Sequence, residues 1–384
     1  MDDIIKQVLE RERQISVDDA MKSDSRQRKA HKIDEELKSL LDKKFVDITI
    51  VGCGGAGKNT LNHLTQVGIK GAKTIAINTD AQDLLVCDAE EKILIGENVT
   101  KGLGAGSDPR IGEEAARESK VAIHNAIGKS NMVFLTCGLG GGTGTGSIPV
   151  VAEISKAMGA LTIAIVTIPF EMEGHSRIMN AKGGIEKLAK HVDTLIVVPN
   201  DKLLEIVPDV PIDQAFFIAD EILVNAIKGI TELITKPGLV NLDFADVRSV
   251  MVDGGMSMIG VGFDDSNNRI QNAVYKALTN PLLALDMTEA TGALINVTGG
   301  PDLTLKESET IVNSIRKNLA ENAKIIWGTS VSDNPKTPVG VMLVVTGIKQ
   351  SVDDLFNDLL RAQAFKTGVT TKGRDPHGFG IDML

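Results

Sequence analysis

Two glycine-rich segments are the part of this 384-residue sequence whose residue types point most directly to chemistry. Residues 52–59 read Gly-Cys-Gly-Gly-Ala-Gly-Lys-Asn, and residues 140–146 read Gly-Gly-Gly-Thr-Gly-Thr-Gly. Each follows a short apolar run and opens a stretch of helical period. Backbone without side chains can approach a phosphate closely, and the free N–H groups and dipole of a helix N-terminus attract an anion. We therefore expect the two segments to converge on one polyphosphate.

The first segment fits two sequence patterns. Gly52, Gly54 and Gly57 match the G-x-G-x-x-G of dinucleotide-binding domains, with Asp80 placed like the acidic residue that contacts the ribose. The same segment resembles a P-loop, except that Asn59 stands where a Ser or Thr would bind magnesium. Taken alone, it leaves open both a dinucleotide-binding oxidoreductase and a nucleoside-triphosphate-binding protein.

The second segment favours the nucleoside triphosphate. A dinucleotide-binding domain has no use for another glycine cluster after another strand. A flexible linker is a poor alternative, because residues 140–146 lie between strongly apolar runs and contain threonines that can cap or donate. A third glycine loop, residues 102–106, can reach the same edge of the sheet and contact a terminal phosphate through backbone N–H groups.

Short β-branched runs alternate with stretches of helical period from residue 45 onward. The pattern predicts strands at 47–51, 73–77, 132–137, 161–167 and 194–198, and helices at 57–68, 112–128, 143–158 and 176–190. Such alternation is typical of a parallel sheet covered by helices, in which ligands bind at the carboxyl ends of the strands. The glycine segments fall at those ends.

A second, smaller set of elements follows a long predicted helix. The helix spans about 212–235 and is closed by Lys-Pro-Gly at 236–238. Beyond it we expect strands at 256–262, 292–298, 323–328 and 340–345, with helices at 269–279 and 305–319. The predicted fold class is therefore α/β: a Rossmann-like parallel-sheet domain, a long central helix and a smaller α/β C-terminal domain.

The two ends of the chain differ from this body. Residues 1–44 contain 11 acidic and 11 basic residues and form a charged helical or disordered extension, so the formal net charge of −10 lies on the rest of the chain. This acidic body argues against nucleic acid as a partner. Residues 349–384 are predicted to be a flexible tail. The apolar residues at its end form either a short docking peptide or simply a frayed end.

Cysteine usage and hydropathy indicate a cytoplasmic protein. Cys53, Cys87 and Cys137 match neither a disulfide framework nor paired zinc ligands. The longest apolar run, residues 159–170, has 12 residues, whereas a membrane span needs ~20, so we expect no direct membrane insertion. The acidic N-terminus lacks the apolar region of a secretory signal.

The sequence resembles the tubulin and FtsZ superfamily, and within it the archaeal-type FtsZ cell-division GTPases. Residues 140–146 are the signature of that superfamily, and further blocks match in order at 78–81, 102–106, 169–174 with Arg177, and 241–246. The resemblance covers roughly four fifths of the chain. It implies the tubulin/FtsZ fold, with a GTP-binding domain at 45–211, the central helix at 212–238 and a C-terminal activation domain at 239–348.

The resemblance also implies the nucleotide-binding residues. They are Gly54, Gly55, Ala56, Gly57, Lys58, Asn59, Asn78, Asp80, Ala105, Gly106, Gly140, Gly141, Gly142, Thr143, Gly144, Thr145, Gly146, Glu173, Arg177, Asn200, Phe216 and Asp220. Phe216 and Asp220, four apart on one helix face, are assigned to the base. A carboxylate can accept from guanine N1–H and the exocyclic amine, whereas adenine has an acceptor at N1 and no such amine. The alternative is that Asp220 is a solvated helix residue.

Glu173 and Arg177 have an alternative role, and Lys58 departs from the family pattern. Glu173 and Arg177 are four apart, so a helical salt pair competes with the ribose and neighbouring contacts that the resemblance assigns to them. Lys58 departs from the family, whose members usually have a small or amide residue there. It either adds a phosphate contact or points to solvent, and we expect the second.

Asn241, Asp243 and Asp246 form the block that resembles the family's catalytic loop. The helix that carries Asp220 continues to about residue 236, some ~24 Å at 1.5 Å per residue, so these carboxylates lie beyond its far end. We expect the loop of one subunit to reach the nucleotide of the next, in a head-to-tail homopolymer. Asp243 and Asp246 would position the attacking water, with capping of the next helix as the alternative role.

The resemblance also has implications for cofactors, partners and cellular localisation. The resemblance implies GTP or GDP with Mg²⁺ held by phosphates and water, no protein metal ligands, and hydrolysis that depends on assembly. It also implies a division-ring scaffold at midcell, joined to a membrane-anchoring adaptor through the C-terminal peptide. Alternatives are a tubulin-like regulator that does not hydrolyse nucleotide and the oxidoreductase. The role of the N-terminal extension stays open.

Overall fold

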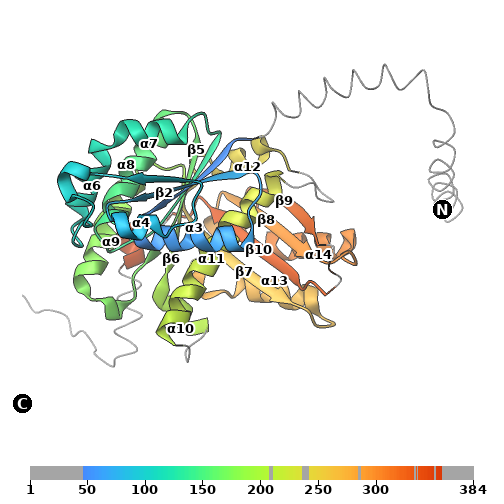
Figure 1. Cartoon of the computed structure of the whole chain (residues 1–384). Helices are drawn as coiled ribbons and strands as arrows, with labels where there is room; N and C mark the ends of the chain where they lie inside the picture. Colours follow the sequence, from blue (N-terminus) through green and yellow to red (C-terminus); the bar gives the residue numbers. More distant parts are fainter. Residues whose placement is uncertain are drawn as a thin grey trace, which may run out of the picture. The chain divides into compact units, whose positions relative to one another are not determined.

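Figure 1 shows the computed structural model of the chain, which describes residues 46–206, 211–235, 242–283, 287–332, 334, 336–349 and 352–356. The expectations for residues 1–44, for Asn241 and for the C-terminal peptide lie outside these described residues. The labels below are those of Figure 1.

Six parallel strands form the first part of the sheet. They are β1 Ile48–Cys53, β2 Ala72–Asn78, β3 Glu91–Leu94, β4 Met132–Gly138, β5 Leu161–Ile168 and β6 Thr194–Pro199. Their order in space is β3-β2-β1-β4-β5-β6, which is that of a doubly wound sheet. The five predicted strands are confirmed. β3 is an additional strand, and its sequence Glu-Lys-Ile-Leu has too few apolar residues to show a strand pattern.

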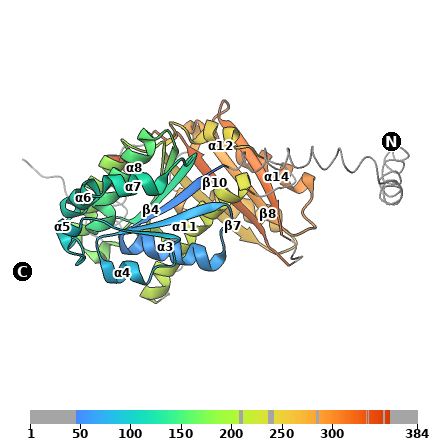
Figure 2. The same ribbon diagram turned by 45° about the horizontal axis from the view of Figure 1, so that its top comes forward.

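Helices cover both faces of these strands (Figures 1 and 2). They are α3 Gly54–Val67, α4 Ala81–Leu85, α5 Glu97–Thr100, α6 Pro109–Glu118, α7 Lys120–Ile127, α8 Thr143–Ala157, α9 His175–Leu188, α10 Asn200–Ile206 and α11 Ile212–Thr235. The single helix predicted at 112–128 is wrong, because the backbone at Ser119 leaves the helical region and divides it into α6 and α7.

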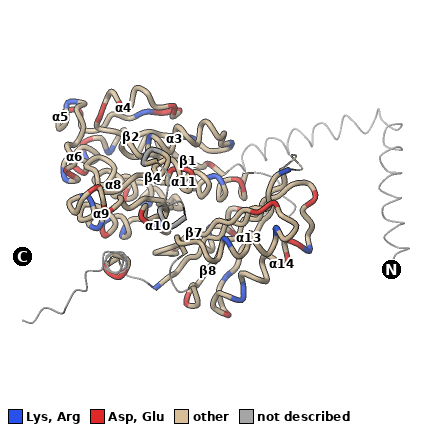
Figure 3. The backbone as a smooth tube through the Cα atoms, turned by 90° about the horizontal axis from the view of Figure 1, so that it is seen from below, with Lys and Arg blue, Asp and Glu red and all other residues tan. Residues whose placement is uncertain are grey.

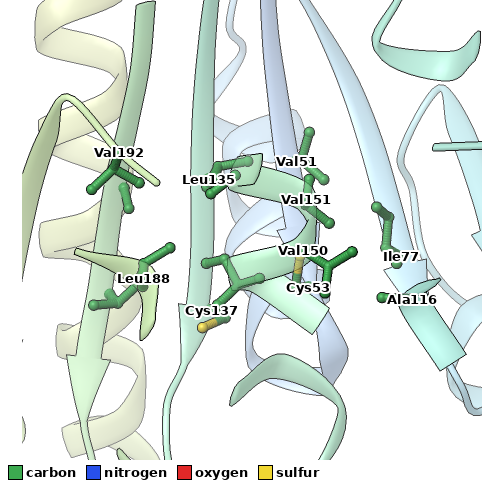
Figure 4. Close-up of a cluster of buried hydrophobic side chains, with 14 of the residues drawn as sticks. Val51, Cys53, Ile77, Ala116, Leu135, Cys137, Val150, Val151, Leu188 and Val192 are labelled. Atoms are coloured by element: carbon green, nitrogen blue, oxygen red, sulfur yellow. The ribbon is translucent and has the colours of Figure 1, made fainter. Parts of the chain in front are cut away.

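Two apolar layers, one on each face of the sheet, hold this part together. Val51, Leu135 and Cys137 pack beneath α8, where Val150 and Val151 meet them (Figure 4). On the other face, α3 and α11 bury their apolar sides against alternate residues of the same strands. Burial of both faces explains why these strands read as nearly continuous apolar runs in the sequence.

The second set of elements extends the same sheet. The helices are α12 Phe244–Met251, α13 Arg269–Leu278 and α14 Leu305–Arg316, and the strands are β7 Gly255–Asp264, β8 Gly292–Gly299, β9 Lys324–Val331 and β10 Val339–Thr346. β6 pairs in parallel with β7, which gives one ten-stranded sheet that continues β6-β7-β10-β8-β9. β10 runs antiparallel to both of its neighbours. The predicted strands and helices of this part are confirmed.

The described end of the chain returns to the first part of the sheet. Leu355 and Phe356 are buried in the apolar layer beneath α8, and Asp353 pairs with Lys182 of α9 at 2.5 Å. Basic and acidic residues are scattered along both parts of the described chain (Figure 3). Within the described ranges, no helix is both long and apolar enough to cross a bilayer.

Candidate functional site

A cavity of about 310 Å³ lies where β1, β4, β5 and β6 end. Both glycine segments form its wall. Gly54 begins α3 with φ +70°, and a Cβ added there would lie 2.8 Å from the backbone nitrogen of Gly144 in the first turn of α8. The two helix N-termini therefore meet at one place, as the sequence predicts.

Neither of these helix N-termini has a side-chain cap. The residues that precede the helices, Cys53 and Gly142, make no capping hydrogen bond, whereas Asp108 and Thr304 cap α6 and α14 with their side chains. First-turn N–H groups without intrahelical partners need an acceptor. Two uncapped helix N-termini at one cavity are suited to an anion such as a polyphosphate.

Most of the predicted binding residues line this cavity. They are Gly54, Gly55, Ala56, Asn59, Gly141, Gly142, Thr143, Gly144, Glu173, Arg177, Asn200, Phe216 and Asp220. Six further lining residues are not on the predicted list: Cys53, Gly138, Leu139, Thr167, Pro169 and Ala219. Gly138 and Thr167 lie at the carboxyl ends of β4 and β5, so the rule that ligands bind at strand ends could have found them.

The other predicted residues support the lining loops and do not line the cavity. Asp80 caps α4, and the Asn78 amide donates to Asp83 at 2.7 Å. Thr145 accepts from the backbone of Gly140 at 2.8 Å. Gly57 and Gly146 are needed for close packing, because an added Cβ at either position would strike backbone. Ala105 packs against Gly142 from the loop that ends at Gly106. Their direct contact with nucleotide stays a prediction.

Lys58 does not point to solvent. Its ammonium group forms an ion pair with the carboxylate of Asp83, and the side chain is largely buried. The expectation that Lys58 points to solvent is wrong, and it does not line the cavity. Asp83 lies in α4 and also accepts from Asn78 at the end of β2, so Lys58 helps to fix α4 against β2.

Asp220 and Phe216 face the cavity from α11. Burial raises the pKa of Asp220 to about 6, although the Thr60 hydroxyl, which donates to its Oδ1 at 3.1 Å, and the charge of His63 both act to lower it. Phe216 is 42% exposed and meets Phe170 edge to face at 5.2 Å, which leaves ring surface for stacking. The alternative that Asp220 is a solvated helix residue is wrong, because its carboxyl is largely buried and lines the cavity.

Asn200 offers a further polar atom to a ligand. It is 4% exposed and lines the cavity, and its side-chain oxygen has no hydrogen-bond partner among the described residues. A buried acceptor of this kind is unfavourable unless it is matched by a donor. The amine of a base or a ribose hydroxyl has the right chemistry to provide one.

Glu173 and Arg177 form an ion pair at 2.6 Å at the cavity wall. They do not share one helix: Glu173 ends a short 3₁₀ turn, Glu171–Glu173, and Arg177 lies in the first turn of α9, with Gly174 at φ +100° between them. Glu173 also accepts from the backbone of Phe170 at 2.9 Å. The pair is thus held in place at the cavity, and ion pairing is compatible with ligand contact.

Asp243 and Asp246 lie at the other end of α11. Leu242, next to Asp243, and Leu233, in the last turn of α11, both approach Gly328. This places the start of the Asp243 loop near the end of α11. Fifteen residues separate Asp220 from the helix end at Thr235, about 23 Å at 1.5 Å per residue. Asp243 and Asp246 cap α12 together, so the capping role is present. They do not line the cavity that contains Asp220.

Among the described residues, no group of three or more His, Cys, Asp or Glu side chains is arranged to hold a metal ion. The wall of the cavity consists of backbone donors, the partly buried carboxylate of Asp220, an aromatic face and an ion pair. This set fits a purine nucleotide polyphosphate better than a metal centre or a nucleophilic triad.

Comparisons with known proteins agree with this geometry. A sequence model of the Tubulin/FtsZ family, GTPase domain, matches residues 47–208, and one of the FtsZ family, C-terminal domain, matches residues 255–349. Cell division protein FtsZ 1 of Methanocaldococcus jannaschii is 55% identical over 336 residues, 88% of this chain and 92% of the relative. Its counterpart in Thermococcus kodakarensis is 57% identical over 316 residues, 82% of this chain and 84% of the relative.

Solved structures give the same picture. An empty FtsZ dimer of M. jannaschii aligns with a TM-score of 0.79 at 57% identity, covering 82% of this chain and 92% of that one. The GDP-bound monomer of CetZ1 from Haloferax volcanii aligns with a TM-score of 0.71 at 23% identity, covering 83% and 99%, and therefore shares the fold.

Proposed function

Because the chain belongs to the tubulin/FtsZ family of GTPases, on its FtsZ branch, we propose that it binds GTP in this cavity and hydrolyses it at the junctions of a head-to-tail filament. The observation that carries the proposal is the meeting of two uncapped helix N-termini at a cavity that also contains Asp220. Family membership removes the oxidoreductase alternative.

The phosphates would lie against the first turns of α3 and α8. Backbone N–H groups there can stabilise negative charge in the ground state and the charge that moves during phosphoryl transfer. Phe216 would stack on the base, and Asp220 would accept from the donors on the guanine edge. Glu173 and Arg177 would contact the ribose and its neighbourhood, and Asn200 would accept from the nucleoside.

Mg²⁺ fits this site as a companion of the nucleotide. The lining beside the glycine loops presents N–H donors, which suit phosphate oxygens and not a cation. We therefore place the ion on phosphate and water oxygens, where it would neutralise charge on the transferring group. Its removal by a chelator is expected to abolish hydrolysis.

Hydrolysis would need a second subunit. α11 continues about 23 Å from Asp220 to its end at Thr235, and Asp243 and Asp246 follow that end, so we place them out of reach of a nucleotide bound in the same chain. In a head-to-tail contact, the loop of one subunit would cover the nucleotide of the next, where the two carboxylates would position the attacking water and Asn241 would orient it. Such a contact repeats into an open filament unless its rotation closes a ring.

The cellular role follows from the same family. We propose a cytoplasmic scaffold at the midcell division ring, tied to the membrane by an adaptor that binds the C-terminal peptide at 377–384. Deletion of these eight residues is expected to abolish capture of the adaptor and leave GTP hydrolysis intact. Retained capture would show that the adaptor binds elsewhere.

Phosphate release and negative-stain microscopy test the proposal together. With GTP we expect phosphate release and filaments; with GDP we expect neither at the same protein concentration, and ATP should not replace GTP. Filaments with GTP but no phosphate release would favour the alternative, a tubulin-like regulator that binds nucleotide without turnover.

A further inference from the structure

A partly buried seam, in which Thr60 and His63 are buried and Phe217 is exposed, joins α3 to α11 behind the cavity. α3 contributes Thr60 and His63, three residues apart, and α11 contributes Phe217, Asp220 and Glu221. The two helices lie side by side (Figures 1 and 2). Of these five residues, Asp220 is the one that lines the cavity. The other four are therefore placed to act on a ligand only through it.

Thr60 contacts Asp220 directly. Its side chain is fully buried, and its hydroxyl lies 3.1 Å from Asp220 Oδ1 and 3.2 Å from the carbonyl oxygen of Ala56, one helical turn earlier. A hydroxyl carries a single proton, so these two acceptors compete for it. The ionised carboxylate is the stronger acceptor, because hydrogen bonds to charged groups are shorter and stronger than those between neutral groups.

His63 is engaged elsewhere in the seam. Its Nε2 lies 2.9 Å from Glu221 Oε2, and its ring stacks on Phe217 at a centroid distance of 4.7 Å. The imidazole therefore acts on Asp220 through its charge. The hydrogen bond that orients the Asp220 carboxylate comes from Thr60.

This inference rests on guanine binding as proposed above. We propose that Thr60 is a positioning residue for guanine specificity: its hydroxyl holds the Asp220 carboxylate in the plane in which both oxygens meet the guanine edge. A carboxylate has about four lone-pair sites, so the Thr60 bond leaves enough for N1–H and the exocyclic amine. Without that bond, the carboxylate can rotate and the two contacts to the base weaken together.

Comparing the dissociation constants of GDP and IDP distinguishes a positioning role of Thr60 from a packing role. IDP lacks only the exocyclic amine, so the ratio of its dissociation constant to that of GDP reports the amine contact. In calorimetric titrations of the nucleotide-depleted full chain, Thr60→Val should weaken GDP more than IDP and lower this ratio by about fivefold. Thr60→Ser, which retains the hydroxyl, should keep the ratio.

The chain offers a matched control on the same helix. Thr65 is exposed, and its hydroxyl donates to the Leu61 carbonyl at 3.0 Å, so Thr65→Val makes the same chemical change away from Asp220. The ratio should not change in Thr65→Val. Thr60→Ala repeats the test with a small side chain of high helix propensity, in case valine disturbs folding.

A double-mutant comparison completes the design. In an Asp220→Ala background, Thr60→Ala should cause no further loss of GDP affinity, because the group that Thr60 positions is gone. An unchanged GDP-to-IDP ratio in both Thr60→Val and Thr60→Ala, or an equal loss for both nucleotides, overturns the inference while guanine binding stands. Failure of the unmodified chain to bind GDP overturns the proposed function and the inference with it.

Discussion

Asp243 and Asp246 cap the first turn of α12 reciprocally. The Asp243 carboxylate accepts from the backbone N–H of Asp246 at 2.8 Å, and the Asp246 carboxylate accepts from the backbone N–H of Asp243 at 3.3 Å. The two proposed catalytic carboxylates are thus fixed by the same backbone that they cap. Capping and catalysis can be separated by substitution.

Asp243→Asn is expected to keep the fold and lose hydrolysis. Asparagine caps a helix about as well as aspartate, so the melting temperature should stay close to that of the unmodified chain. The charge that positions water is gone, so GTP turnover should fall by about tenfold or more. Asp243→Ala should lose turnover and also about 1 kcal/mol of stability. Full turnover in the asparagine variant would leave Asp243 with the capping role alone.

Affinity for GDP is expected to depend on pH through Asp220. Burial raises the pKa of this carboxyl to about 6, and only the ionised form accepts from both guanine donors. Affinity should therefore be nearly constant above about pH 7 and fall by about tenfold on going to about pH 5, as the carboxylate becomes protonated. Asp220→Asn, which has no ionisable carboxyl at this position, is the control. An equally steep fall in that variant would exclude Asp220 as its source.

Close packing of α6 on α8 is expected to make Gly146 intolerant of a side chain. A Cβ there would lie 2.0 Å from the carbonyl oxygen of Pro109. Gly146→Ala should lower stability by about 1–3 kcal/mol through overpacking. Gly183→Ala in α9 is the matched change, because nothing lies within 4 Å of its Cβ, and it should stabilise the helix by about 0.5–1 kcal/mol. Thermal unfolding of both variants checks the prediction, and equal melting temperatures would contradict it.

The fold could be predicted from sequence where local pattern and tertiary structure agree. Continuous apolar runs such as β4 and β5 are buried on both faces, so their strands are evident. β3 has no strand pattern because its four residues include two charges, and the break at Ser119 depends on how α6 and α7 pack. Short elements at the edge of a sheet carry too little pattern of their own.

The parts of the site that could be predicted are those formed by consecutive residues of the chain. The two glycine segments are evident from residue type and spacing, whereas the role of Asp220 is implied by the resemblance to the family. Thr60 is not evident in this way, because its role arises only when α3 packs on α11, 160 positions along the chain. The position of Lys58 cannot be read from the sequence for the same reason, since Asp83, its ion-pair partner, lies 25 positions away in α4. Contacts between distant segments are fixed by packing and leave no local signal.

Mixing two inactive variants is the most direct test of hydrolysis at a shared junction. Asp246→Ala keeps the nucleotide cavity and loses a proposed catalytic carboxylate. Gly144→Val keeps that carboxylate and crowds the cavity wall, where an added Cβ would lie 3.1 Å from the Cys53 carbonyl oxygen. Each variant alone should release little phosphate, and the unmodified chain should show turnover per subunit that rises with protein concentration. An equimolar mixture should recover phosphate release well above the sum of the two variants. Full activity of Asp246→Ala alone, together with turnover per subunit that is independent of concentration, would contradict a site shared between subunits.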